Sequence, residues 1–274
     1  NTLSDALGLL ARESTRGRLL AGGTDLIVQW QSGVVTPPDR VVDISNIAEI
    51  QYVRDGNDCV LIGAGATHAR LKDDPLVNTH LPALAAACAT IGARQIQNRG
   101  TIGGNVANAS PAGDTHPPLL ITGGDVVVAS VGGERRIPMT NFFLDYRRID
   151  LQPDEMIIRF ELPKLPENGR ELFHKIGTRQ AQAISKVMGA CRVVMADGII
   201  QSAAIAMGSV AATCIRLPLL ESWLTGKAIT PELVDEAEKR ASDEVRPIVD
   251  IRSTAAYRKW VSGRIVRGFF ARLS

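Results

Sequence analysis

Hydrophobic positions along the chain alternate between helical and strand-like spacing, and this pattern predicts a mixed α+β protein. Leu3, Ala6, Leu7 and Leu10 recur at helical intervals, which predicts an amphipathic helix from Thr2 to Glu13. The following elements are expected in chain order: a strand at 18–23, a helix at 24–33 capped by Gly23 or Thr24, strands at 40–45 and 59–66, a helix at 81–92, a hairpin at 125–139 and a strand at 155–163.

The pattern changes after residues 164–170, where proline and glycine predict a domain boundary. Beyond it, Asp197-Gly198 predicts a β-hairpin, and Thr230-Pro231 predicts the start of a helix over 231–245. Ser253 is expected to cap a last helix over 254–273. We therefore expect a domain at 1–165, with subdomains of about 1–48 and 49–165, and a smaller domain at 166–274.

Composition narrows the class of protein. The chain has 274 residues, of which 45% are hydrophobic and 22% charged, as is ordinary for a folded soluble protein. Its net charge of +2 gives no reason to expect nucleic acid as a partner. No apolar run approaches the roughly 20 residues that span a bilayer, so we expect a cytoplasmic protein without membrane attachment.

The four cysteines are far apart and form no C-x-x-C pair. Iron–sulfur and zinc sites usually show cysteines at short spacing. We therefore expect no metal in this chain and four buried, reduced thiols: Cys59, Cys88, Cys191 and Cys214.

Two segments place Gly-Gly before a residue that can cap a helix, "LLAGGTDLIVQ" at 19–29 and "TIGGNVANASPAGD" at 101–114. Glycine permits positive φ and close approach of a ligand to the backbone. Successive N–H groups in such a turn form a concavity for an anion, and a following helix adds its dipole. One such loop is more often only a tight turn. Two of them, each after a predicted strand, favour a dinucleotide held at two points.

Polar side chains in both loops add hydrogen-bonding capacity, and no lysine follows as in a nucleoside-triphosphatase loop. A third segment, "GAGATH" at 63–68, lacks the last glycine of a dinucleotide fingerprint, so we interpret it as the end of a strand. Asp114 would be repelled by a pyrophosphate and is expected to face a neutral part of the ligand. Alternatively, Asp114 caps the short turn at 114–119.

These two segments, together with "FFLDYR" at 142–147 and "VDIRSTAAYR" at 249–258, resemble the FAD-binding subunit of molybdenum hydroxylases. This is the group of xanthine dehydrogenase and carbon monoxide dehydrogenase, and the resemblance covers essentially the whole chain. It implies an FAD-binding domain of two α/β subdomains (PCMH-type) with the cofactor in the cleft between them. A smaller domain with a three-stranded antiparallel sheet and helices would follow.

The resemblance also implies residues that bind FAD. The first pyrophosphate loop would comprise Ala21, Gly22, Gly23, Thr24 and Asp25, flanked by Leu20 and Leu26. The second would comprise Thr101, Gly103, Gly104, Asn105 and Asn108. The remaining contacts would be Asp114 on the ribityl chain or the ring, Ile91 on the adenine, Ile158 at the flavin or adenine end, and Lys175 reaching the flavin from the second domain.

Two of these assignments have alternatives. A positive charge at Lys175 would stabilise the reduced flavin and raise its reduction potential, but Lys175 could also be a solvated strand residue. Tyr146 and Arg147 could line the approach to the flavin, although we favour a structural corner.

The resemblance implies an electron-transfer subunit with no catalytic residue of its own. Electrons would arrive from two 2Fe-2S clusters of an iron–sulfur subunit, after substrate oxidation at the molybdopterin of a third subunit, and leave to NAD, a quinone or another acceptor. A dimer of heterotrimers is expected. Two other hypotheses remain open: a self-contained flavin-dependent reductase or oxidase, for which no proton donor can be named, and a non-catalytic scaffold whose glycine loops are only turns.

Overall fold

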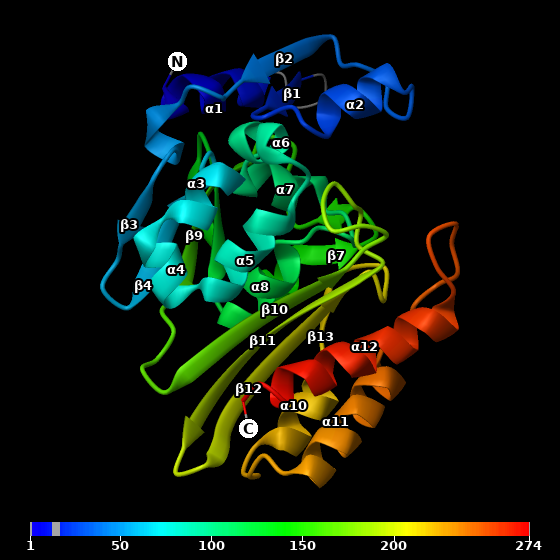
Figure 1. The fold of residues 1–274 in the computed structure, drawn as a ribbon. Helices are drawn as coiled ribbons and strands as arrows, with labels where there is room; N and C mark the ends of the chain where they lie inside the picture. The colour runs from blue at the N-terminus through cyan, green and yellow to red at the C-terminus, as the bar shows by residue number, and fades with distance from the viewer. Residues whose placement is uncertain (1, 13–16, 274) are drawn as a thin grey trace.

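The computed structural model describes residues 2–12 and 17–273 and has three parts that follow one another along the chain (Figure 1). The N-terminal part lies at one end of the molecule, a central sheet with its helices comes next, and a long antiparallel sheet with three further helices lies at the other end. This arrangement confirms the expected fold class. No helix in the described part of the chain is long and apolar enough to cross a membrane.

The N-terminal part is a small helix–strand–helix–strand unit, as the sequence predicts. Its two strands pair in parallel, and its elements are α1 (Leu3–Arg12), β1 (Gly17–Leu20), α2 (Leu26–Gln31), β2 (Arg40–Asp43) and the 3₁₀ helix η1 (Ala48–Ile50). The predicted cap of α2 is wrong, because Asp25 precedes the helix and makes no capping hydrogen bond with its side chain. Glu13, the expected end of the first helix, lies outside the described residues.

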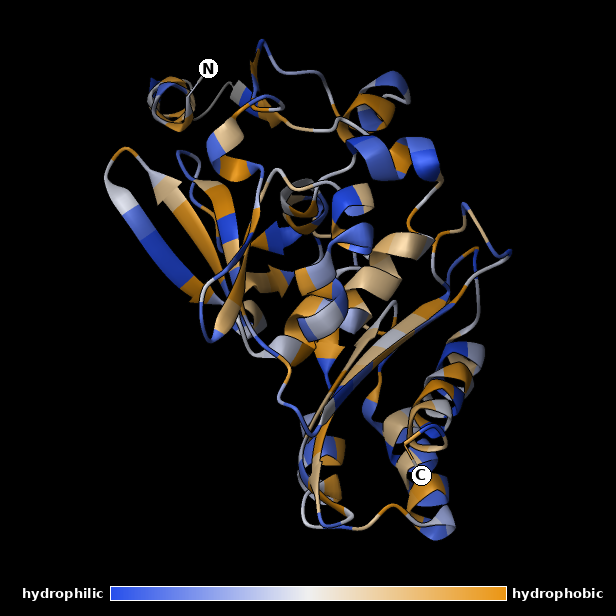
Figure 2. Ribbon diagram, turned by 60° about the vertical axis from the view of Figure 1, so that its left-hand side comes forward, coloured by the Kyte–Doolittle hydropathy of each residue, from blue (hydrophilic) through white to orange (hydrophobic). Residues whose placement is uncertain are grey.

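The central part is built on a five-stranded antiparallel sheet of order β3-β4-β9-β5-β6. Its strands are β3 (Val53–Asp55), β4 (Cys59–Gly63), β5 (Asp125–Ser130), β6 (Gly133–Pro138) and β9 (Met156–Pro163). The helices are α3 (His68–Asp73), α4 (Pro75–His80), α5 (Pro82–Thr90), α6 (Arg94–Arg99), α7 (Ile102–Asn108), α8 (His116–Thr122) and α9 (Met139–Phe142), and a small hairpin joins β7 (Phe143–Asp145) to β8 (Arg148–Ile149). Hydrophobic segments run through these strands and the helices packed on them (Figure 2).

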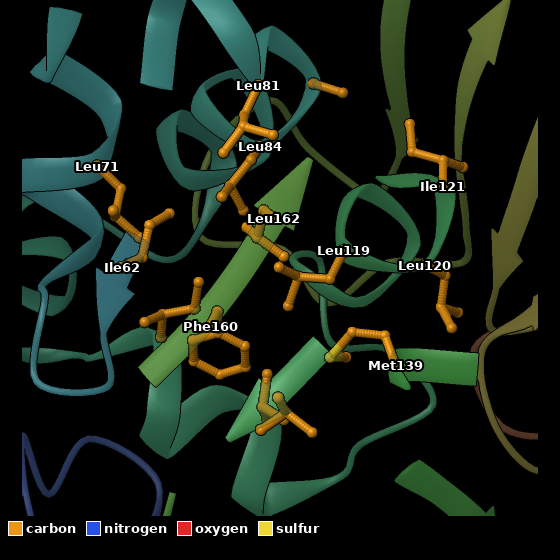
Figure 3. Packing of buried hydrophobic residues seen from close by; sticks show 14 of the residues in the cluster. Ile62, Leu71, Leu81, Leu84, Leu119, Leu120, Ile121, Met139, Phe160 and Leu162 are labelled. Carbon is orange, nitrogen blue, oxygen red and sulfur yellow. The ribbon is translucent and has the colours of Figure 1, made fainter. Parts of the chain in front are cut away.

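The two faces of the central sheet bury different cores. On one face, Phe160 and Leu162 of β9 point toward apolar side chains of the helices, including Leu84 of α5 and Leu119 of α8 (Figure 3). On the other face, the N-terminal unit packs its own apolar residues against β5 and β9. The N-terminal unit therefore has no separate core and depends on the central sheet to bury its apolar side.

A β-bulge at Ile158 reverses the faces to which alternate residues of β9 point. In the pairing of β5 with β9, Val127 lies opposite Arg159 and Val128 lies opposite Ile157, which leaves Ile158 as the extra residue. Such a bulge changes the face to which the following side chains point. Ile158 accordingly packs in the core under the N-terminal unit, whereas Phe160 packs in the core under the helices.

The C-terminal part is an antiparallel sheet of order β10-β11-β12-β13, sandwiched between helices. Helices α5 and α8 of the central part pack on it, as do α10 and α12, with α11 against α12. The bounds are β10 (Gly169–Ile176), β11 (Val187–Ala196), β12 (Ile199–Gly208), β13 (Ile215–Arg216), α10 (Pro218–Leu224), α11 (Pro231–Glu244) and α12 (Ala255–Phe270). The sheet thus contains the three expected strands and, next to β12, the additional two-residue strand β13.

In the C-terminal part, short sequence signals correctly predict the hairpin turn and one of the two helix caps. Asp197 and Gly198, both at positive φ, connect β11 to β12, and the hydroxyl of Thr230 caps α11, as predicted. The predicted cap of the last helix is wrong, because Thr254 rather than Ser253 accepts the capping hydrogen bond. The expectation of four buried thiols is also wrong in one case, since the thiol of Cys59 is partly exposed.

Candidate functional site

The first glycine loop lies directly against the segment that leads into the second loop. A Cβ atom on Gly22 would stand 1.9 Å from the carbonyl oxygen of Arg99 and 3.0 Å from the Cα of Gly100. Because the backbone of the first loop touches the backbone of this segment, no side chain fits at Gly22. The glycine at this position is therefore explained by contact between the N-terminal unit and the central part.

Gly22→Ala is expected to destabilise the fold by roughly 1–3 kcal/mol or more, since the added methyl group forces two backbone segments apart. Thermal unfolding of the full-length chain measures the effect. Gly8→Ala is the matched control, because a Cβ on Gly8 in α1 meets no atom within 4 Å and alanine is the better helix former. Equal melting temperatures for the two variants would contradict the close contact.

The first glycine loop presents a row of unused backbone donors. The N–H groups of residues 21–25 have no acceptor among the residues that the structure describes. Gly23 has φ +72°, the left-handed conformation that turns successive N–H groups toward one point. The loop is therefore suited to bind an anion through its backbone.

The second loop differs from the expectation that both loops offer free backbone donors. The N–H of Ile102 donates to Ala66 O at 3.0 Å, that of Gly103 to Ala64 O at 2.9 Å, and that of Gly104 to the Thr101 hydroxyl at 3.1 Å. A Cβ on Gly103 would lie 2.7 Å from Ala64, so this glycine permits close packing within the central part. The amides at the start of α7 are thus already satisfied by the protein.

Gly104 nevertheless leaves space on the side of α7 that faces α2. It is exposed, and a Cβ there would meet only the Thr101 hydroxyl, at 3.0 Å. Asn108 lies one turn later on the same face, where its Oδ1 accepts from Gln29 Nε2 of α2 at 3.1 Å and from Arg147 Nη1 at 3.2 Å. The open side of Gly104 therefore faces α2, the helix that follows the first loop.

A cavity of about 290 Å³ adjoins the point where the loops meet. Both loops line it, through Ala21 and Gly22 on one side and Thr101 on the other. Further polar groups come from Ser45 and Arg70. Its position beside the unused amides makes it a candidate for part of a nucleotide.

Asp114 occupies a buried position between the central and C-terminal parts. Its Oδ2 lies 2.5 Å from Lys175 Nζ of β10, and its Oδ1 accepts from the Ser185 hydroxyl at 2.5 Å. The Lys175 ammonium also donates to Thr90 O at 3.0 Å. Only 9% of the Lys175 side chain and 8% of the Asp114 side chain are exposed, which excludes both the solvated lysine and the capping role considered for these two residues.

Burial raises the pKa of Asp114, and the Lys175 charge together with the Ser185 hydroxyl opposes that shift. At Asp25, the last residue of the first loop, the pKa is likewise raised because the carboxylate is desolvated, and Arg147 partly offsets the change. Both carboxylates therefore depend on nearby cations to stay ionised.

Ile91 and Ile158 lie in different surroundings. Ile91 follows Thr90, whose carbonyl binds Lys175, so Ile91 and Lys175 lie at the same end of the site. The sequence had assigned them to opposite ends of the dinucleotide. Ile158 is buried between the central sheet and the N-terminal unit, in the same core as Ile44, which lines the cavity.

Sequence reasoning missed Ser185 and did not assign contacts to Gln29 or Arg147. Ser185 carries no motif signal, because it is a lone hydroxyl in an irregular segment, and Gln29 ends the first glycine segment as a surface-type residue on a helix. Arg147 was favoured as a structural corner together with Tyr146. It does adopt φ +52° in the turn after β7, but its guanidinium reaches Asn108, while the ring of Tyr146 is exposed.

Comparison with known protein families decides the class. Residues 1–165 match the family described as the FAD binding domain in molybdopterin dehydrogenase, and residues 173–273 match the CO dehydrogenase flavoprotein C-terminal domain. This chain belongs to the FAD-binding subunits of the molybdenum hydroxylases. The FAD subunit is accordingly part of an oxidoreductase, as the sequence resemblance had indicated.

Related FAD subunits span nearly the whole chain. The FAD-subunit of nicotinate dehydrogenase from Eubacterium barkeri is 30% identical over 99% of this chain and 92% of its own length. The carbon monoxide dehydrogenase medium chain of Hydrogenophaga pseudoflava is 30% identical over 97% of this chain and 92% of its own. The xanthine dehydrogenase FAD-binding subunit of Escherichia coli O157:H7 is 30% identical over 94% and 88%.

Solved structures share the fold of this FAD subunit. Carbon monoxide dehydrogenase from Hydrogenophaga pseudoflava superposes with a TM-score of 0.93 at 28% identity, covering 97% of this chain and 92% of that chain. Quinoline 2-oxidoreductase from Pseudomonas putida 86 gives a TM-score of 0.92 at 26% identity, covering 99% and 93%. The unused amides of the first loop and the adjoining cavity fit the diphosphate and a nucleoside of the cofactor that the family binds.

Proposed function

We propose that this FAD subunit passes electrons from the iron–sulfur clusters of a partner subunit to an acceptor such as NAD or a quinone. The flavin, when bound, can accept electrons singly and release them in pairs. The observation that carries the proposal is the row of free amides in residues 21–25 beside a cavity that both glycine loops line.

We place the two ends of FAD as follows. The diphosphate binds the amides of residues 21–25, and the adenosine enters the cavity beside Thr101. The isoalloxazine then lies toward Asp114, Lys175 and Ile91. In this arrangement Ile91 is a flavin contact rather than an adenine contact, because Lys175 binds the carbonyl of the preceding residue.

The other predicted contacts act as supports in this arrangement. Thr101 and Gly103 hold the start of α7 against the central part, while Gly104 and Asn108 present the open side of α7 to α2. Asn105 accepts from the Thr115 hydroxyl at 2.6 Å, which leaves its amide NH₂ free to donate. Leu20 and Leu26 flank the anion-binding loop, and Thr24 within it adds a hydroxyl donor.

Lys175 supplies the electrostatic part of the function. Its ammonium is held by Asp114 and by Thr90 O at the end of α5, so its charge has a fixed position. A fixed positive charge in a dry site stabilises negative charge that develops nearby. We infer that Lys175 raises the reduction potential of the bound flavin, and that this chain contributes placement and electrostatics rather than a general base.

The partners we propose are an iron–sulfur subunit with two 2Fe-2S clusters and a molybdopterin-binding subunit, assembled as a dimer of heterotrimers. Support comes from related chains whose names call them the FAD-subunit or medium chain of a dehydrogenase, or the medium subunit of a hydroxylase. Substrate oxidation would occur on the molybdenum subunit and not on this chain.

Purification of the complex through a tag on this chain tests the proposal. We expect FAD, iron and molybdenum in one assembly, with flavin absorbance that a substrate bleaches and the acceptor restores. A colourless complex without FAD would refute it. Steady turnover of an organic substrate by the isolated chain would instead favour the self-contained flavoenzyme.

A further inference from the structure

Ser185 has a buried hydroxyl that, among the described residues, donates to the carboxylate of Asp114 alone. It precedes β11 and is 1% exposed, and it donates to Asp114 Oδ1 at 2.5 Å. Its backbone is fixed in turn, because its carbonyl accepts from the Ser209 hydroxyl at 3.1 Å. The C-terminal part thus reaches Asp114 through two separate groups, the Ser185 hydroxyl and the Lys175 ammonium.

The two groups bind different oxygens of Asp114, and this fixes the orientation of the carboxylate. With Oδ1 on Ser185, the other oxygen is directed at Lys175. Lys175 has only one further acceptor in the described part of the chain, the carbonyl of Thr90. The position of the ammonium therefore depends on an Asp114 carboxylate that cannot rotate away.

The other titratable groups around Asp114 supply no replacement charge. The thiols of Cys88 on α5 and Cys214 before β13 are buried, and burial raises the pKa of both. The imidazole of His116 on α8 is buried, which lowers its pKa to about 4, and it contacts Asn105 O. All three are neutral near pH 7, so Lys175 is the countercharge that Asp114 meets within the described residues.

We propose that Ser185 is a positioning residue for the flavin: by anchoring Asp114 it keeps the Lys175 ammonium in place at the flavin end of the site. This proposal rests on the proposed function, since it assigns Lys175 to bound FAD. Ser185 itself need not touch the cofactor. A hydrogen bond to a charged group contributes enough to shift the ionisation of its acceptor by a pH unit or more.

The test uses the full-length chain in its complex, stripped of FAD and titrated with FAD between pH 5 and pH 8. Ser185→Ala removes the donor and leaves the volume nearly unchanged. We expect the acidic limb of the affinity profile to move to higher pH by about one pH unit, because Asp114 without the hydroxyl is protonated more readily. Ser185→Thr keeps the hydroxyl and should restore the original profile.

Ser262→Ala is the matched control, because that hydroxyl is also buried and, among the described residues, donates to Arg258 O of its own helix and not to a titratable group. Coincident profiles for Ser185→Ala, Ser262→Ala and the parent would overturn the role of Ser185 while leaving FAD binding intact. Should Ser185→Ala not fold, Ser185→Cys is compared with Ser185→Thr, and identical profiles again overturn it. A parent complex that binds no FAD at any pH refutes the proposed function instead.

Discussion

Gly104→Val is expected to weaken FAD binding by at least about 100-fold, which corresponds to roughly 2.7 kcal/mol. A Cβ on Gly104 meets only the Thr101 hydroxyl, at 3.0 Å, so the FAD-free protein accommodates the valine if that hydroxyl shifts by a few tenths of an ångström. It does not fit beside a diphosphate held on residues 21–25, because that side of α7 faces α2. Titration of the FAD-free protein, followed by flavin fluorescence, measures the loss.

The control for this variant is Gly268→Val. Gly268 is also an exposed helical glycine, on α12, and a Cβ there meets no atom within 4 Å. It should bind FAD as the parent does, and both variants should show the parent's melting temperature within a few degrees. Full FAD affinity in Gly104→Val would mean that the cofactor does not pass this face of α7.

Lys175→Met is expected to lower the free energy of unfolding at pH 8 by about 3–5 kcal/mol, because it leaves the buried Asp114 carboxylate without its countercharge. Adding Asp114→Asn should recover most of the loss, since the uncompensated charge is then removed. Urea unfolding of the FAD-free protein measures both changes. If Lys175→Met alone were as stable as the parent at pH 8, the Lys175–Asp114 pair would contribute little to the free energy of unfolding.

The deficit of Lys175→Met should depend on pH in a definite direction. Burial already raises the pKa of Asp114, and loss of Lys175 raises it further. The folded variant then binds a proton that the unfolded chain has released, so its stability falls as the pH rises from the ordinary Asp pKa of about 4 toward the raised value. The deficit is therefore smaller at pH 5 than at pH 8. Lys164→Met, which breaks the surface pair with Asp55, should leave the unfolding midpoint nearly unchanged at both pH values.

The fold was largely predictable because local signals and the hydrophobic pattern agree. Asp197-Gly198 and Thr230-Pro231 each contain the conformational preference that their turn or helix start requires. The errors concern choices between neighbours, such as Thr254 over Ser253, which the final docking of α12 decides. The bulge at Ile158 could not be predicted from the sequence either, because it arises from pairing with β5 and not from local composition.

The site was predictable only in part, for a physical reason. Glycine indicates that something lies close to the backbone, but it does not tell a ligand from another segment of the protein. At Gly22 and Gly103 the neighbour is the protein itself, whereas Gly104 is open. The amides of the first loop are free because the folded chain leaves them without an acceptor. The role of Ser185 follows from a hydrogen bond between two parts of the fold. Sequence patterns contain neither kind of information.

The contacts on Asp114 also bear on when the cofactor can be acquired. The anion-binding loop is synthesised first, Asp114 much later, and Lys175 and Ser185 only after the central sheet is complete. A nascent chain that has completed its first 165 residues therefore still lacks the groups that fix the flavin end. Insertion of FAD should be a post-translational step, coupled to docking of the last sheet rather than to synthesis of the glycine loops.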